Sequence, residues 1–164
     1  TALEPLTEAT QDGYRAAALL LQANIALEKN DSKKAIAGYA KLVADESLPK
    51  PFRDLALVRQ TAAEFDTLKP QQVVDRLKPL AVPGNAWFGS AGEMVALAYL
   101  NMNKSDLAGP LFAQLAKDEG VPATIRSRAL QMAGVEGIDA VELDGDDKKV
   151  TPPNTGAAKG EAKE

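Results

Sequence analysis

Apolar residues recur along the chain at the three-to-four-residue spacing of amphipathic helices. From Tyr14 to about Asn30 this spacing is kept by Ala17, Leu20, Leu21, Asn24, Ile25 and Leu27, of which only Asn24 is polar. A second segment begins at Ser32, a candidate N-cap, and continues through Val43 until Pro49 interrupts it. The pattern predicts two consecutive helices joined by a short turn.

Five more helical segments follow, separated by prolines, glycines and asparagines. The spacing predicts them over about 52–68, 70–80, 87–102, 105–117 and 122–135, and Gly137 ends the last one. In the segment that begins at Pro70, the residues expected to face inward are Val73, Val74, Leu77 and Leu80.

The sequence also matches itself when it is shifted by 73 residues. The segment 23–57 then aligns with 96–130, and 13 of the 35 positions are identical. The matches include apolar positions, such as Leu42 with Leu115, and residues of the turns, such as Pro49 with Pro122. Because 73 is close to twice 36, a third unit is expected between the two similar ones.

Composition supports helices throughout. The chain contains 29 alanines and 20 leucines, two of the best helix formers, whereas aromatic residues make up only 5%. We expect an all-α fold, an α-solenoid of about three helical hairpins with a C-terminal capping helix. The domain would span 1–138, with repeats at about 14–49, 52–82 and 87–122 and the cap at 122–136. Residues 139–164 have the composition of a disordered tail.

The charge and the missing residue types exclude several classes of function. The net charge is −4, which argues against nucleic-acid binding. Histidine and cysteine are both absent, so the usual zinc ligands, cysteine nucleophiles and disulfides are excluded. We expect no enzymatic activity, no cofactor and no metal site.

The hairpins resemble tetratricopeptide repeats. Such repeats place small residues where their two helices cross, an aromatic residue four positions after the second small one, and a proline at the end. The first unit matches this pattern at Ala23, Ala35, Tyr39, Leu42 and Pro49, and the last at Ala96, Tyr99, Ala108, Phe112, Leu115 and Pro122. The middle unit fits only if its turn is longer by about one residue.

More narrowly, 14–137 resembles a bacterial family of short tetratricopeptide-like proteins. They carry a repeat domain in the periplasm and an N-terminal membrane anchor, which these 164 residues do not include. The resemblance rests on the Tyr-Arg-Ala-Ala-Ala sequence at 14–18, the alanine-rich first helix and three repeats in a short chain. It implies a location on the periplasmic side of the inner membrane, and partners among Sec translocon components and periplasmic chaperones.

In a solenoid of this kind, the first helix of each hairpin lines the concave surface, where partner proteins or peptides bind. The candidate binding residues on these helices are Asn24, Glu28, Arg59, Asp66, Glu93, Met94 and Asn101. Each could instead be a solvated or helix-stabilising side chain. Asn24 is unusual, because a polar group on an apolar stripe needs a partner. Trp87 and Phe88 are expected in the core, although an exposed tryptophan would mark a contact site.

The alternative is a structural module that associates with itself as a homodimer or larger oligomer. An apolar outer face on the last helix, around Ile125, Ala129 and Met132, would favour this alternative.

Overall fold

The computed structural model describes residues 11–139, and this part of the chain contains helices and no strands. The all-α prediction is therefore confirmed for these residues. The predicted tail lies outside the described residues, apart from Asp139. The helices are α2 (Asp12–Glu28), α3 (Ser32–Ala44), α4 (Lys50–Glu64), α5 (Pro70–Leu77), α6 (Phe88–Asn101), α7 (Ser105–Lys117) and α8 (Ala123–Val135).

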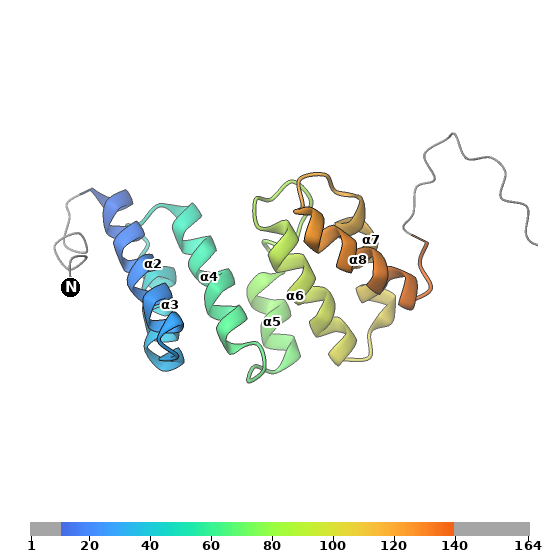
Figure 1. Ribbon diagram of the computed structural model, residues 1–164, viewed down its shortest axis with the longest axis horizontal. Coiled ribbons are helices and arrows are strands. Elements are labelled where there is room, and N and C mark those ends of the chain that lie inside the picture. The colour runs from blue at the N-terminus through green and yellow to red at the C-terminus, as the bar shows by residue number, and fades with distance from the viewer. Residues whose placement is uncertain (1–10, 140–164) are drawn as a thin grey trace, which may run out of the picture.

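The helices follow one another along the long axis of the molecule (Figure 1). Helices α2, α4, α6 and α8 face the viewer, and each contacts the next of this set. Each of α3 and α7 packs against the helices that precede and follow it in the sequence. Among consecutive helices the packing is weakest between α4 and α5, because α5 packs mainly on α6. Helices α2, α4, α6 and α8 therefore lie side by side along one face of the molecule and form one layer.

Several helix boundaries differ from the predicted ones. The N-cap of α3 is Asp31 rather than Ser32, because the Asp31 carboxylate accepts a hydrogen bond from the Lys34 backbone N–H at 3.0 Å. Helix α4 ends at Glu64, four residues before the predicted end, and a turn follows it. Helix α5 ends at Leu77, just before Pro79, which has no N–H to continue the helical bonds.

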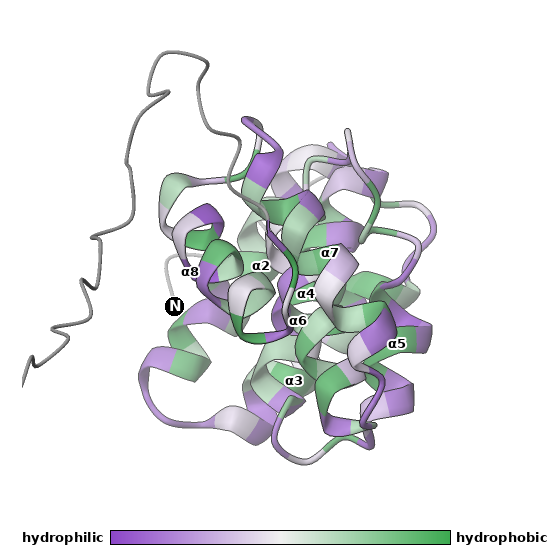
Figure 2. Cartoon of the chain, turned by 90° about the vertical axis from the view of Figure 1, so that its right-hand side faces the viewer, coloured by the Kyte–Doolittle hydropathy of each residue, from purple (hydrophilic) through white to green (hydrophobic). Residues whose placement is uncertain are grey.

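Small residues allow the helices to approach closely. The buried residues of α2 are alanines, at 16, 18, 23 and 26, whereas Ala17 and Leu21 are exposed. At the crossing with α3, a Cβ added to Gly38 would lie 2.9 Å from the Cβ of Ala23. All four residues predicted to face inward from the 70–80 segment are buried. Figure 2 shows the hydrophilic residues gathered at the turns and outer edges of the packed helices.

The 73-residue shift also relates the backbone of the two ends of the molecule. Helix α3 (Ser32–Ala44) aligns with α7 (Ser105–Lys117) without a change of length. Asn30 and Asn103 precede these helices with φ angles of 60° and 55°, which non-glycine residues rarely adopt. The prolines at 49 and 122 are the N-caps of α4 and α8. The shared positions therefore fold in the same way.

Candidate functional site

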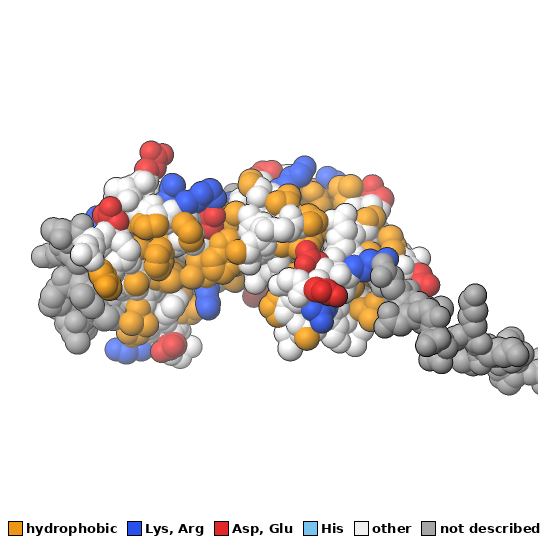
Figure 3. Space-filling view, turned by 90° about the horizontal axis from the view of Figure 1, so that it is seen from above, with side chains coloured by type: hydrophobic (Ala, Val, Ile, Leu, Met, Phe, Trp, Pro, Cys, Tyr) orange, Lys and Arg blue, Asp and Glu red, His pale blue; other side chains and the backbone are white. Residues whose placement is uncertain are grey.

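Two neighbouring grooves lie on the side formed by α2, α4, α6 and α8, and Arg59 of α4 lines both of them. The first groove has a volume of about 280 Å³ and is lined by Asn24, Leu27, Glu28 and Arg59. The second has a volume of about 410 Å³ and is lined by Leu55, Val58, Arg59, Ala62, Trp87, Ser90, Glu93, Met94, Ile125 and Arg128. In the space-filling view, one long side is hollowed about half-way along the molecule (Figure 3).

These grooves bring together five of the seven predicted site residues. Asn24, Glu28 and Arg59 meet in the first groove. Arg59 also meets Glu93 and Met94 in the second. Asp66 and Asn101 line neither groove. Asp66 lies in the turn beyond the early end of α4, and Asn101 is the exposed last residue of α6.

The unusual polar position on α2 has a structural partner. The hydroxyl of Tyr39, whose side chain is fully buried, donates a hydrogen bond of 2.7 Å to the amide oxygen of Asn24. Burial raises the pKa of Tyr39, which favours the protonated donor, and the charge of Arg59 opposes this shift. Asn24 therefore satisfies a core tyrosine, while its amide nitrogen donates to no group within residues 11–139.

Arg59 is exposed and lies where the two grooves meet. Among the described residues it forms no ion pair and no hydrogen bond, although Glu28 lines the same groove. Its guanidinium therefore keeps its five N–H donors available for a ligand.

Glu93 has a partner from the neighbouring helix of the same layer. Its two carboxylate oxygens accept hydrogen bonds of 2.8 Å each from Nε and Nη2 of Arg128 on α8. This bidentate contact raises the pKa of Arg128, chiefly through the hydrogen bond with Glu93. The pair links α6 to α8 along the second groove, so Glu93 has a structural role there.

The second groove contains apolar residues that were not among the predicted binding residues. Leu55 and Ala62 line it from α4, and Ile125 lines it from α8. Ile125 was expected on an outer face of the last helix instead. Helical spacing alone does not distinguish a residue on an outer face from one in a groove or at the edge of a core. Arg128 could not be found from the sequence either, since its partner Glu93 is 35 residues away.

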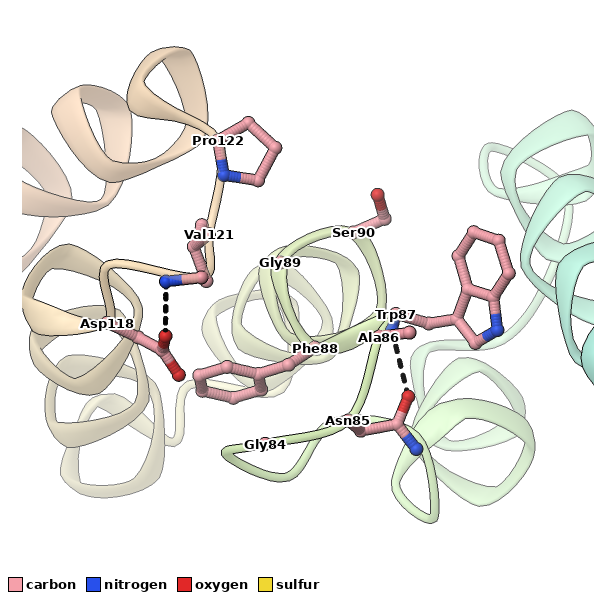
Figure 4. Close-up of a pocket in the computed structure, with 11 residues that line it drawn as sticks. Gly84, Asn85, Ala86, Trp87, Phe88, Gly89, Ser90, Asp118, Val121 and Pro122 are labelled. Atoms are coloured by element: carbon pink, nitrogen blue, oxygen red, sulfur yellow. Dashed lines mark hydrogen bonds between the residues drawn. The ribbon is translucent and has the colours of Figure 1, made fainter.

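Trp87 and Phe88, which the sequence treats alike, have different environments. Phe88 is 1% exposed and belongs to the core between α6, α7 and α8. Trp87 is partly buried, lines the second groove and points toward α4 (Figure 4). Its backbone N–H donates to the Asn85 side chain at 2.8 Å, which fixes the turn before α6. Phe88 is therefore a core residue as predicted, whereas Trp87 packs at the edge of a second core and also lines the groove.

Figure 4 also shows a third cleft, of about 360 Å³, between the turn before α6 and the turn before α8. Its most polar side chain, Asp118, already accepts a hydrogen bond of 2.8 Å from the Gly120 backbone N–H. This carboxylate therefore stabilises its own turn. Three glycines and several apolar side chains make up most of its lining, which is consistent with an interhelical loop.

The described residues hold no group of three or more acidic side chains that could bind a metal ion. No helix in this part of the chain is both long and apolar enough to cross a membrane. Comparison with known proteins gives no match to any family model, to any curated protein or to any solved structure.

Proposed function

We propose that this protein binds partner proteins or peptides along the side formed by α2, α4, α6 and α8. The observation that carries the proposal is the pair of adjoining grooves that share Arg59. Together they form a surface that crosses helices distant in the sequence, and half-buried apolar side chains alternate there with polar groups. Such a surface suits an extended partner segment better than a small, enclosed ligand.

The proposed architecture is an α-solenoid of three tetratricopeptide-like hairpins and a capping helix. Two features support it: the helices pack in sequence order, and the 73-residue shift aligns helices, turns and caps. The middle hairpin is the least regular, since α5 has only eight residues and contacts α4 weakly. In such a stack the first helices of the hairpins line the binding surface. Here the corresponding helices, α2, α4 and α6, all contribute residues to the two grooves.

The proposed setting follows from the resemblance to anchored periplasmic repeat proteins. In that setting the protein is an adaptor or chaperone-like partner of the export machinery, and translocon or periplasmic chaperone components are its candidate partners. It acts through binding alone, without a cofactor. Its place would be the periplasmic side of the inner membrane.

Site-specific photo-crosslinking in cells of the source organism tests this proposal. Photoreactive residues belong at Glu28, Ala62 and Ser90, which line the grooves and form no ion pair within 11–139. Asn24 and Glu93 are unsuitable, since each holds a structural hydrogen bond. Control probes at Lys33 and Lys41 lie on α3, in the other layer. Capture of the same partner from the groove probes, but not from the control probes, supports the proposal. Equal capture from both layers contradicts it.

Self-association remains the second candidate, because α2 carries exposed apolar residues at the end of the stack. Tyr14 is 64% exposed and Leu21, two turns later on the same face, is 45% exposed. On the last helix, the residues expected on an apolar outer face are not exposed: Ala129 is fully buried, and Ile125 and Met132 pack on the core formed with α6 and α7. The exposed apolar residues of α8 are instead Leu130 and Val135, which are 37% and 77% exposed. Crosslinks to a second copy from a probe at Leu21, with none from the grooves, would favour self-association.

A further inference from the structure

We propose that the occupant of the grooves is an internal peptide segment of a partner, carrying an acidic side chain beside a large apolar one. The acidic group binds Arg59, and the apolar side chain binds in the second groove between Trp87 and Met94. This inference rests on the proposed function and specifies the chemistry of the partner.

Charge complementarity carries the first half of the inference. Four of the residues that line the grooves are charged, and two of them, Glu93 and Arg128, neutralise each other through two hydrogen bonds of 2.8 Å. Of the other two, Glu28 is at the last turn of α2, whereas Arg59 lies where the grooves meet. A carboxylate at that junction would gain charge-assisted hydrogen bonds from Arg59.

A second donor faces the same place. Asn24 and Arg59 line the first groove together, and the amide oxygen of Asn24 is held by Tyr39. The Tyr39 hydrogen bond therefore fixes the orientation of the amide and leaves its N–H₂ group for the groove. A carboxylate has two oxygens and can accept from both residues at once.

The apolar half of the inference comes from the second groove. On the α6 side of Arg59, this groove contains Trp87 and Met94, which are partly buried against the core of α5 and α6. Leu55 and Ile125 extend its apolar lining onto α4 and α8. Tryptophan and methionine surfaces adapt well to varied apolar side chains.

The position of Arg59 indicates an internal segment rather than a chain end. Grooves continue from Arg59 in both directions, toward α2 and toward α8, so a bound chain has room on both sides. The acidic residues of this chain's own tail are a less suitable source. After α8, the side chain of Ile138 packs close to Gly109 of α7, a helix that lines neither groove.

The test is selection from a random library of 12-residue peptides, displayed between constant flanks so that every peptide is internal. The full chain is compared with three variants of itself. Arg59→Glu reverses the proposed contact, and Lys33→Glu makes the same change on α3, outside the grooves. A third variant, with Glu142 changed to Gln and with Asp144, Asp146 and Asp147 changed to Asn, removes the cluster of acidic residues at the start of the tail.

We expect the unchanged protein to enrich peptides with Asp or Glu close to a large apolar residue. Arg59→Glu should replace this preference by one for Lys or Arg, while Lys33→Glu should retain it. A selected peptide should bind Arg59→Gln about tenfold more weakly, as expected for the loss of a charge-assisted contact. The tail variant should bind it as the unchanged protein does.

Three results would overturn the inference. The first is enrichment without acidic residues, or an acidic preference that survives Arg59→Glu. The second is a severalfold gain in affinity in the tail variant, which would make the tail itself the occupant. The third is no enrichment at all. If groove crosslinks still capture a partner in any of these cases, only the peptide chemistry is wrong; if they capture none, the proposed function fails too.

Discussion

The hydroxyl of Tyr39 on α3 and the amide oxygen of Asn24 on α2 form a 2.7 Å hydrogen bond that has no counterpart at the other end of the molecule. The 73-residue shift places Leu97 at the position of Asn24 and Phe112 at that of Tyr39. The two equivalent positions are therefore occupied by a polar pair at one end of the molecule and by an apolar pair at the other. Only the polar pair leaves a hydrogen-bond donor facing a groove.

Exchanging the polar pair for the apolar one gives the first prediction. Tyr39→Phe removes one hydrogen bond and should lower the free energy of unfolding by about 1 kcal/mol. Asn24→Leu leaves the buried Tyr39 hydroxyl without its partner and should cost about 1–3 kcal/mol. The double variant copies the Leu97–Phe112 pair, so its loss should be smaller than the sum of the two single losses. Urea denaturation of all four proteins measures this coupling.

Additive losses in this cycle would contradict the role given to the hydrogen bond. A matched cycle on Leu97 and Phe112 provides the control. The double variant that combines Leu97→Asn with Phe112→Tyr should lose less stability than Leu97→Asn alone, because the new hydroxyl would again satisfy the new amide.

The crossing of α2 and α3 gives a second prediction, on stability. Gly38→Ala would place a Cβ 2.9 Å from the Cβ of Ala23, so the helices must separate. Overpacking of this kind typically costs about 1–3 kcal/mol. A Cβ added to Gly134 of α8 would meet no atom within 4 Å, so Gly134→Ala should instead stabilise the protein by up to about 1 kcal/mol. Thermal unfolding of the two variants should move the midpoint in opposite directions.

The two left-handed asparagines give a third prediction. Asn30 and Asn103 adopt φ angles of 60° and 55° in the turns that precede α3 and α7. Asparagine tolerates this conformation, whereas alanine loses about 1 kcal/mol or more in it. Asn30→Ala and Asn103→Ala should therefore destabilise the protein by similar amounts, and the glycine variants should change it little. Unequal losses would show that the two turns do not carry the same backbone strain.

Residues that act through local rules are where sequence reasoning succeeds. Ser105 and Lys117 bound α7 as predicted, since a turn precedes the helix and the apolar spacing ends with it. Pro79 shortens α5 and Asp31 replaces Ser32 as the N-cap, because competing local signals lie within a residue or two of each other. Which of these neighbouring signals sets the helix boundary depends on the hydrogen bonds that form, and the sequence does not show which of them is stronger.

Sequence reasoning fails for contacts between residues that are far apart in the chain. Asn24 is an exception on an apolar stripe until Tyr39, 15 residues later, supplies its partner. Helical register placed Arg59 and Glu93 on one surface, but only the structure separates the unpaired Arg59 from Glu93, which Arg128 holds. Trp87 and Phe88 are adjacent in the chain, and the direction of the first helical turn sends one to a groove and the other to the core.

The turn between α3 and α4 gives the last prediction, on pH dependence. The Ser47 hydroxyl, which donates to Oδ1 of Asp45, is the main cause that holds the pKa of Asp45 below its usual value of 3.8. The Ser47 backbone N–H and Arg15, whose Nη2 lies 3.4 Å from Oδ2, lower it further. A carboxyl group whose pKa is lowered by folding stabilises the protein above its unfolded pKa, and this contribution is lost as the pH falls through the folded pKa. Asp45→Asn should therefore destabilise the protein at neutral pH, and the difference from the unchanged protein should shrink below pH 3.8. Denaturation midpoints at neutral and acidic pH measure it, and an equal difference at both would show that the ionised form of Asp45 contributes nothing to the turn.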